Sequence, residues 1–192
     1  MIAFDIDGCM NNIKEDIARI GSNFFSQYSP VIHREGYYLR EIFPGLPEEL
    51  YEKFWDEYGY EIYTNPPKDY VFETVDYIRH AGLKACIITT RDTDRRFSGR
   101  DFKEITDEWL QKYNIGLPVY YEKNKHLLVR SLGVELMVED KPGNILKLQE
   151  VTDVLIFRHP YNQNMHGRFV DNWQQVLDCI KTGAEPAFVK MF

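Results

Sequence analysis

The chain has 192 residues, 44% hydrophobic and 28% charged, which is ordinary for a globular protein with one good-sized core. Its formal net charge of −7 argues against a general binder of nucleic acid polymers, because sequence-independent binding to phosphate backbones needs a basic face. Three scattered cysteines, no apolar run of membrane-spanning length and no signal segment before the first predicted strand favour a cytoplasmic protein with no membrane contact.

The first predicted strand is followed by two carboxylates. Residues 1–4 form an apolar run typical of a strand buried on both faces of a parallel sheet. Asp5 and Asp7 follow at a spacing of two, so both point towards the crevice where α/β folds bind ligands. Such a pair is reasonable if a cation lies between the carboxylates or one of them holds a proton. The alternative is an Asx-type turn that closes the strand, with Gly8 at the turn.

The next stretch contains no apolar strand run. A helix is predicted over residues 11–28 and a second over 47–58, and a proline-rich break follows at 64–67. We therefore expect residues 13–67 to form a small helical cap inserted after the first strand.

The rest of the chain alternates between strands and helices. Strands are expected at 84–89, 117–121, 136–138 and 153–157, helices at 70–81, 101–113, 125–131, 142–149 and 173–180, and a basic loop at 91–100. This order predicts an α/β fold with a doubly wound parallel sheet, formed by residues 1–12 and 68–182. Residues 183–192 are expected to be a C-terminal tail.

Reactive side chains follow three of the predicted strands. The first strand leads to Asp5 and Asp7, the second ends at Thr89, and the strand at 136–138 is followed by Glu139 and Asp140. Lys125 begins the helix before that last strand. Oxygen ligands for a hard cation, a carboxylate nucleophile and donors for phosphoryl oxygens together predict magnesium-assisted phosphoryl transfer.

Each of these residues also has a simpler interpretation. Thr89 is a common hydroxyl at a strand end, Lys125 an ordinary helix residue, and Glu139 with Asp140 an acidic start to the next helix. Their joint occurrence at the ends of the predicted strands and at the start of the preceding helix favours an enzyme active site over these separate interpretations. Lys123 is the main rival for the lysine role, and Thr90 for the hydroxyl.

These residues, in this order, resemble the motifs of the haloacid dehalogenase superfamily of phosphatases. That pattern is DxDG at the first strand, a hydroxyl after an apolar strand, a lysine, and an acidic pair. More narrowly, the chain resembles bacterial nucleotidases related to the 5'(3')-deoxyribonucleotidases, in the stretches 54–58, 61–66, 139–142 and 160–163. Cys9 and Met10 depart from the Thr or Val that commonly follows DxDG.

The resemblance implies specific roles. Asp5 would form an aspartyl-phosphate, and Asp7 would act as general acid and base. Mg²⁺ would be held by Asp5, the Asp7 backbone carbonyl and Asp140, with Glu139 nearby or bound through water. Thr89 and Lys125 would hold the phosphoryl oxygens.

Other residues are weaker candidates for substrate contacts. Arg91 and Lys141 adjoin the motifs and are candidate phosphate contacts. Phe54 and Trp55 are candidates for stacking on a nucleobase, although an aromatic pair on a helix is more often part of a core. The five histidines lack metal-ligand spacing and receive no role.

The expected function is Mg²⁺-dependent hydrolysis of a small phosphomonoester, with a nucleoside monophosphate as the expected substrate. The alternative within the same chemistry is a sugar phosphate or another small metabolite. A phospho-receiver signalling domain also combines acids, a hydroxyl and a lysine on a parallel sheet, but the early insert of about sixty residues counts against it. A catalytically inactive scaffold is a third possibility. The sequence does not fix the oligomeric state.

Overall fold

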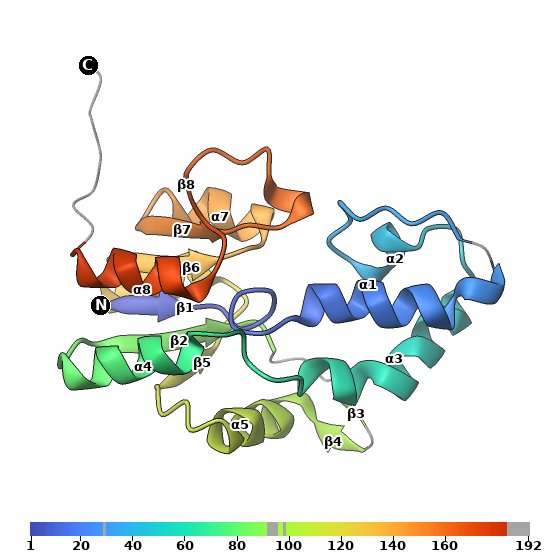
Figure 1. Ribbon diagram of the computed structural model, residues 1–192, viewed down its shortest axis with the longest axis horizontal. Helices are drawn as coiled ribbons and strands as arrows, with labels where there is room; N and C mark the ends of the chain where they lie inside the picture. Colours follow the sequence, from blue (N-terminus) through green and yellow to red (C-terminus); the bar gives the residue numbers. More distant parts are fainter. Residues whose placement is uncertain (29, 92–95, 98, 184–192) are drawn as a thin grey trace.

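A six-stranded parallel sheet forms the centre of the computed structural model, which describes residues 1–28, 30–91, 96–97 and 99–183 (Figure 1). The strand order is β5-β2-β1-β6-β7-β8, and every neighbouring pair is parallel. The strands are β1 (Ile2–Phe4), β2 (Ala85–Thr89), β5 (Val119–Tyr121), β6 (Leu136–Glu139), β7 (Asp153–Phe157) and β8 (Arg168–Val170). The most amino-terminal strand therefore lies inside the sheet, between β2 and β6.

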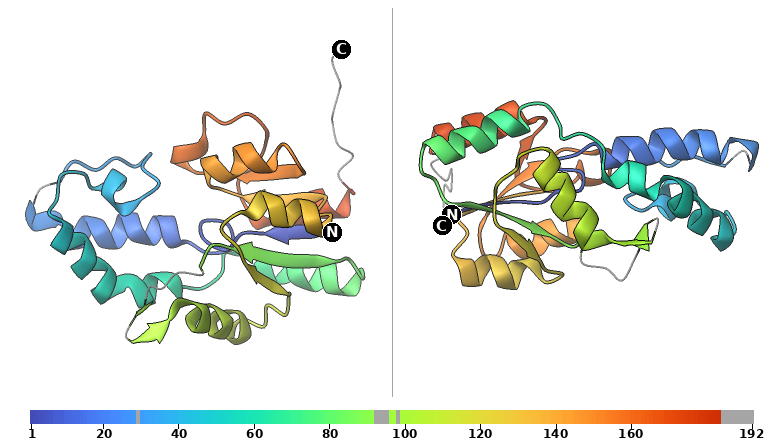
Figure 2. Two further views of the ribbon diagram at one scale, coloured as in Figure 1. Left: turned by 180° about the vertical axis from the view of Figure 1, so that it is seen from behind. Right: turned by 90° about the horizontal axis from the view of Figure 1, so that it is seen from below.

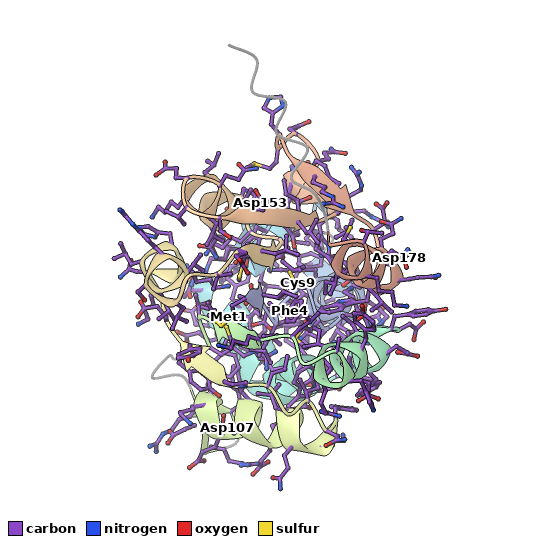
Figure 3. All side chains as sticks on the ribbon, turned by 90° about the vertical axis from the view of Figure 1, so that its left-hand side faces the viewer. Met1, Phe4, Cys9, Asp107, Asp153 and Asp178 are labelled. Atoms are coloured by element: carbon purple, nitrogen blue, oxygen red, sulfur yellow. The ribbon has the colours of Figure 1, made fainter. Side chains whose placement is uncertain are left out.

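Helices cover both faces of this sheet (Figure 2). Helices α4 (Val71–His80) and α8 (Trp173–Lys181) pack on one face, and α6 (Lys125–Leu132) and α7 (Pro142–Leu148) on the other. Helix α5 (Phe102–Lys112) contributes Trp109 to the first of these cores. Along β1, Ala3 and Phe4 point to opposite cores, as the period of a strand requires. Figure 3 shows Phe4 amid the side chains, with Asp107 and Asp178 at the periphery.

Between β1 and α4, the chain forms a helical unit beside the sheet (Figure 1). It contains α1 (Ile13–Phe24), the 3₁₀ turn η1 (Ser26–Tyr28), α2 (Leu39–Ile42) and α3 (Glu48–Tyr63). These elements share a hydrophobic cluster of their own, to which Ile17, Phe25 and Phe54 belong. None of the helices in the described part of the chain is long and apolar enough to cross a membrane.

A short hairpin between β2 and α5 packs against the helical unit. Strands β3 (Arg96–Phe97) and β4 (Arg100–Asp101) pair antiparallel and lead directly into α5. Phe97 and Phe102 form a small cluster against which Trp55 and Tyr63 of α3 pack. Gly59 is required there, because a Cβ would lie 2.4 Å from the Phe97 ring. The helical unit thus contacts the sheet domain both at α1 and through this aromatic cluster.

The predicted α/β class and parallel sheet are confirmed, and four local features differ from the sequence analysis. Strand β8 and helix α2 were not predicted, α3 continues to Tyr63, and the predicted basic loop contains the β3–β4 hairpin. Residues 92–95 and 98 of that loop, and residues 184–192 of the predicted tail, lie outside the described residues. The predicted boundaries of the cap at residues 13 and 67 stay predictions.

Candidate active site

The sheet order brings the predicted reactive residues to one edge. Strand β1 is flanked by β2 and β6, so the carboxyl ends of these three strands are adjacent. Asp5 follows β1, Thr89 ends β2, and Glu139 ends β6 directly before Asp140. All four are at least 95% buried. Residues more than eighty positions apart in the sequence therefore share one site.

Lys125 joins two of the buried carboxylates. Its Nζ lies 2.8 Å from Asp5 Oδ1 and 2.8 Å from Glu139 Oε2. Glu139 also accepts hydrogen bonds from the Asn144 amide and from the backbone N–H of Lys141, at 3.2 and 3.0 Å. Glu139 thereby holds Lys125 in place. The rival Lys123 is exposed on the outside of the domain.

The nucleophile candidate has one oxygen engaged and one oxygen open. Asp5 Oδ1 accepts from the Ile6 N–H at 2.8 Å and pairs with Lys125. Among the described residues, none donates a hydrogen bond to Asp5 Oδ2. Oδ2 is therefore the oxygen that can approach an incoming group.

Asp140 lies beside the turn that follows β1. The Tyr161 hydroxyl donates to Asp140 Oδ2, and the Asn162 amide donates to the Asp140 backbone carbonyl at 2.8 Å. His159 is buried, and its Nε2 lies 2.8 Å from the Gly8 carbonyl oxygen. The segment from His159 to Asn162 thus contacts both the Asp140 strand end and the β1 turn.

Burial and mutual repulsion govern the ionisation of this cluster. Desolvation is the largest cause that raises the pKa of Asp5, to about 7, and Glu139 and Asp7 add to it against Lys125. Desolvation likewise raises the pKa of Asp140 to about 6. Burial disfavours the charged form of Lys125, but the two carboxylates outweigh it and raise the pKa of Lys125.

The acidic cluster fits a cation. Asp5, Glu139 and Asp140 each offer a carboxylate oxygen, and these oxygens lie within 4.8 Å of one another. Buried carboxylates with raised pKa values are the groups that a hard, oxygen-preferring cation stabilises in the ionised form. The donor set consists of oxygen alone, which suits Mg²⁺ better than a metal that prefers sulfur or nitrogen.

Asp7 is not part of the acidic cluster and is paired with an arginine. The Arg91 Nε lies 3.0 Å from both Asp7 oxygens, Nη2 also donates to Oδ1, and the Asn11 amide donates at 3.2 Å. Burial alone would raise the pKa of Asp7, but Arg91 and Asn11 outweigh burial and lower it. Arg91 is 1% exposed, and its Nη1 has no hydrogen-bond partner within the described residues. The guanidinium carbon lies 5.3, 5.4 and 5.8 Å from the ring centroids of Tyr63, Phe102 and Trp109.

Gly8 should tolerate no side chain. Its φ is +82°, and a Cβ would lie 2.3 Å from Asp140 Oδ2, so Gly8→Ala should push Asp140 aside. We expect a loss of roughly 1–3 kcal/mol of unfolding free energy from the backbone alone, and weaker Mg²⁺ binding in addition. The matched control is Gly45→Ala, because Gly45 has φ +80° and no atom within 4 Å of its Cβ position. Equal Mg²⁺ affinities for the two variants in calorimetry would contradict the close approach of Gly8 to Asp140.

The two hydroxyl candidates differ in their surroundings. Thr89 is 1% exposed at the end of β2, and its Oγ1 lies 3.4 Å from the Arg91 backbone nitrogen. Thr90 is exposed and lines the cleft described next. Thr89 ends β2, the neighbour of β1 in the sheet, so it lies at the same edge as Asp5, and its contact with a phosphoryl oxygen stays a prediction.

A cleft of about 510 Å³ opens between the carboxyl edge of the sheet and the helical unit. This volume is within the range of small-molecule sites. Asp7, Thr90, Arg91 and Lys141 line it from the sheet domain. The helical unit and α5 add aromatic rings from Tyr37, Tyr38, Tyr51, Trp55, Tyr63 and Phe102.

Phe54 is a correction to the predicted substrate contacts. It is fully buried in the cluster of the helical unit, where its ring packs on Phe24 and Phe25, and it does not line the cleft. Helix α3 turns Phe54 inwards and presents the neighbouring Trp55 to the cleft instead. A helical repeat of 3.6 residues places adjacent side chains on different faces, and the sequence pair alone did not show which face is buried.

Three residues at the site were not singled out from the sequence. Lys14 of α1 lines the cleft, with its Nζ 3.4 Å from the centroid of the Tyr37 ring. Tyr37 meets Tyr161 edge to face, at 5.1 Å between centroids. Tyr161 follows Pro160 in a stretch that was noted only as a family likeness. Burial lowers the pKa of Lys14, against the attraction of Asp140 and the other site carboxylates.

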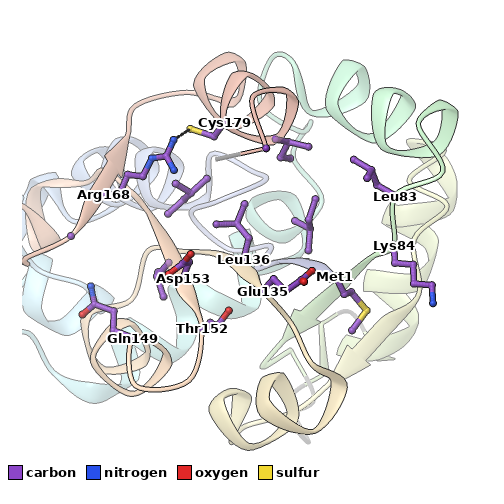
Figure 4. Close-up of a pocket in the computed structure, with 16 residues that line it drawn as sticks. Met1, Leu83, Lys84, Glu135, Leu136, Gln149, Thr152, Asp153, Arg168 and Cys179 are labelled. Atoms are coloured by element: carbon purple, nitrogen blue, oxygen red, sulfur yellow. Dashed lines mark hydrogen bonds and ion pairs between the residues drawn. The ribbon is translucent and has the colours of Figure 1, made fainter. Parts of the chain in front are cut away.

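A larger groove, of about 1160 Å³, lies at the opposite edge of the sheet (Figure 4). Met1, Leu136 and Asp153 line it at the amino ends of β1, β6 and β7. Parallel α/β sheets bind ligands at the carboxyl ends of their strands. The acidic cluster is at that other edge, so the smaller cleft is the candidate active site.

Comparison with known families identifies one match over almost the whole chain. Residues 1–185 match the family described as "5' nucleotidase, deoxy (Pyrimidine), cytosolic type C protein". No curated protein matches the sequence.

Solved structures share the fold at low sequence identity. A HAD family hydrolase from Deinococcus radiodurans R1, determined with bound phosphate and sodium, has a TM-score of 0.63 at 14% identity, covering 95% of each chain. A haloacid dehalogenase-like hydrolase from Streptococcus pneumoniae has a TM-score of 0.60 at 13% identity, covering 93% of this chain and 97% of that one. A predicted phosphoglycolate phosphatase from Haemophilus somnus 129PT has a TM-score of 0.59 at 15% identity, covering 94% and 97%. At such identities the likeness supports the fold alone.

Proposed function

Since the chain belongs to the cytosolic type C family of deoxy (pyrimidine) 5' nucleotidases, phosphatases of the haloacid dehalogenase type, we propose that it hydrolyses nucleoside monophosphates with Mg²⁺. The observation that carries the proposal is the edge formed by Asp5, Lys125, Glu139 and Asp140 below an aromatic-lined cleft. The match to a nucleotidase family over residues 1–185 supports a hydrolase acting on a small phosphate ester and counts against the phospho-receiver alternative.

The first half-reaction transfers the phosphoryl group to Asp5. Asp5 Oδ2 attacks phosphorus, the bond from phosphorus to the ester oxygen breaks, and Asp7 gives its proton to the leaving alcohol. Lys125 and Thr89 hold phosphoryl oxygens. Asp5, Asp140 and the Asp7 backbone carbonyl, with Glu139 nearby, would hold Mg²⁺, which would supply positive charge to offset that of the phosphoryl group.

The second half-reaction restores Asp5. Asp7 takes a proton from water, the water oxygen bonds to phosphorus, and the bond between phosphorus and Asp5 breaks to release phosphate. Asp7 needs a proton for the first step, yet the Arg91 pair favours its ionised form. The unpartnered Nη1 of Arg91 suits a contact with the phosphoryl group. A shift of Arg91 onto the substrate would release Asp7 to accept its proton.

The helical unit of residues 13–67 would act as a cap that closes on the substrate and excludes water. Trp55 lines the cleft from α3, and Tyr37 and Tyr38 line it from the loop before α2. A flat nucleobase can stack on such rings, at roughly 1–3 kcal/mol per base. This favours a nucleotide over a sugar phosphate.

The test is phosphate release from a panel of nucleoside 5'- and 3'-monophosphates, sugar phosphates and p-nitrophenyl phosphate, each with Mg²⁺ and with EDTA. We expect one nucleotide to exceed the sugar phosphates by about tenfold or more in kcat/KM, and EDTA to abolish release. A sugar phosphate with the highest kcat/KM would establish the alternative substrate class, and EDTA-resistant turnover would exclude the metal.

Asp7→Asn should separate acid catalysis from metal binding. We expect a loss of about 10²–10⁴-fold in kcat on a nucleotide, and a smaller loss on p-nitrophenyl phosphate, whose leaving group needs no proton. Mg²⁺ affinity in calorimetry should stay near the wild-type value, because only the backbone carbonyl of residue 7 is assigned to the metal. Asp140→Asn is the comparison, with a large loss of affinity. Equal losses of Mg²⁺ affinity in both variants would show that the Asp7 side chain binds the metal.

A further inference from the structure

Two lysines of the cleft have no carboxylate partner within the described residues. Lys14 Nζ lies 3.4 Å from the Tyr37 ring centroid and 3.3 Å from the Tyr37 carbonyl oxygen. Lys141 Nζ lies 5.1 Å from the same ring centroid and 5.3 Å from that of Tyr38. Both side chains line the cleft.

These lysines differ from the other cations of the cleft. Arg91 is paired with Asp7, and Arg40 is paired with Glu48. Lys125, below the cleft, is held between two carboxylates. Two ammonium groups at one aromatic ring repel each other, and the ring quadrupole offsets only part of that repulsion. An anion between them would remove the repulsion.

The charges of the catalytic edge show which anion this would be. In the resting state, in which Asp7 is ionised and paired with Arg91, four carboxylates, Asp5, Asp7, Glu139 and Asp140, face two cations, Lys125 and Arg91. A divalent cation balances the two negative charges that remain. A phosphomonoester dianion then adds two further negative charges, and Lys14 and Lys141 match them. Buried charges that stay unmatched are costly, so a dianion is favoured only with both lysines present.

We infer that Lys14, on the helical unit, and Lys141, after the metal-binding edge, form a two-lysine subsite at Tyr37 for the substrate's phosphoryl dianion. This inference rests on the proposed phosphatase reaction and adds Lys14 as a specificity-determining residue. One lysine comes from each side of the cleft. Binding of the dianion therefore draws the helical unit towards the sheet domain and links recognition of the phosphoryl group to closure.

The experiment measures binding of inorganic phosphate to the full chain by calorimetry, with Mg²⁺ at pH 8. We expect Lys14→Met to raise the phosphate dissociation constant by at least about tenfold, which is roughly 1.4 kcal/mol, and Lys14→Arg to stay within about threefold of wild type. The control is Lys53→Met, which removes the same charge from an exposed position of α3 and should leave phosphate binding unchanged. Phosphate affinity of Lys14→Met equal to that of wild type would overturn the inference.

Two further readouts separate this subsite from a structural role for Lys14. Because both lysines contact one dianion, the losses in Lys14→Met and Lys141→Met should be non-additive in the double variant. Lys14→Met should raise KM for the phosphate ester more than it lowers kcat. Additive losses, or a loss confined to kcat, would contradict a shared subsite. If the wild-type protein binds phosphate with the expected dependence on both lysines but hydrolyses no ester, the proposed reaction is contradicted and the proposed subsite is supported.

Discussion

Asp5→Asn should abolish turnover, with a loss on the order of 10⁴-fold or more in kcat, because a carboxamide cannot form an aspartyl-phosphate. Asp5 Oδ1 is held by the Ile6 N–H and by Lys125, so Oδ2 is the oxygen assigned to the attack on phosphorus. Asn keeps the volume of the side chain and removes its nucleophilic charge. The measurement is phosphate release from the best nucleotide of the panel and from p-nitrophenyl phosphate. A kcat within about tenfold of wild type on either ester would exclude Asp5 as the nucleophile.

The control for this variant is its thermal stability. The pKa of Asp5 determines the direction in which that stability changes with pH. In the native state this pKa is about 7, above the ordinary value of 3.8, so native Asp5 destabilises the metal-free fold as pH rises from about 4 to 7. Asn does not titrate. In EDTA, the Tm of Asp5→Asn relative to wild type should therefore increase from pH 4 to pH 7 and then remain level. A Tm of the variant far below wild type at pH 8 would show that the lost activity reflects unfolding.

Lys125→Met should produce the largest loss of stability, about 3–5 kcal/mol at pH 8 in EDTA. The lysine ammonium is 2% exposed and is ion-paired to both Asp5 and Glu139. Methionine has a similar shape but leaves two buried carboxylates without their cation. We also expect turnover to be lost, because the same ammonium is assigned to the phosphoryl oxygens. Denaturant unfolding monitored by circular dichroism measures the change in free energy.

Lys123→Met is the matched control, because Lys123 lies two residues earlier and is exposed. Its unfolding free energy should stay within about 0.5 kcal/mol of wild type. The deficit of Lys125→Met should also be smaller at pH 5 than at pH 8, because Asp5, with its raised pKa, is protonated in the native state at the lower pH. A deficit below about 0.5 kcal/mol at pH 8 would show that Lys125 does not hold the two carboxylates together.

The strands that are central in the sheet could be predicted because each is a short apolar run that ends in polar groups. Strand β1, buried between β2 and β6, is the clearest case. Strand β8 escaped prediction because it has three residues, begins with an exposed arginine and lies at the sheet edge. The β3–β4 hairpin has only two residues in each strand, too few for any periodic pattern.

The candidate site also contains residues whose placement could be predicted from the sequence and residues whose placement could not. That Asp5, Thr89 and Asp140 lie at one edge could be predicted, because parallel strands bring their carboxyl ends together whatever the packing of the helices. Their roles, and that of Lys125 at the start of α6, stay predictions. The orientation of side chains on a helix depends on what the helix packs against. Phe54 was therefore named as a candidate for stacking on a base, with a core position as the alternative, and it belongs to the core. Lys14 looked like an ordinary residue on the polar side of α1, because the sequence does not show that this side faces the cleft.

The most direct measurement is the mass of the enzyme during turnover. Asp7→Asn, in which hydrolysis of the intermediate lacks its base, is mixed with p-nitrophenyl phosphate, whose leaving group needs no acid, and with Mg²⁺, and is quenched with acid. We predict one added phosphoryl group per chain, located by peptide mapping on the segment that contains Asp5 and removed by hydroxylamine, which cleaves acyl phosphates. The wild-type enzyme should carry less, and the Asp5→Asn variant none. Phosphate release with no phosphoryl group on Asp5 in any quenched sample, or with one on another residue, would contradict an aspartyl-phosphate mechanism.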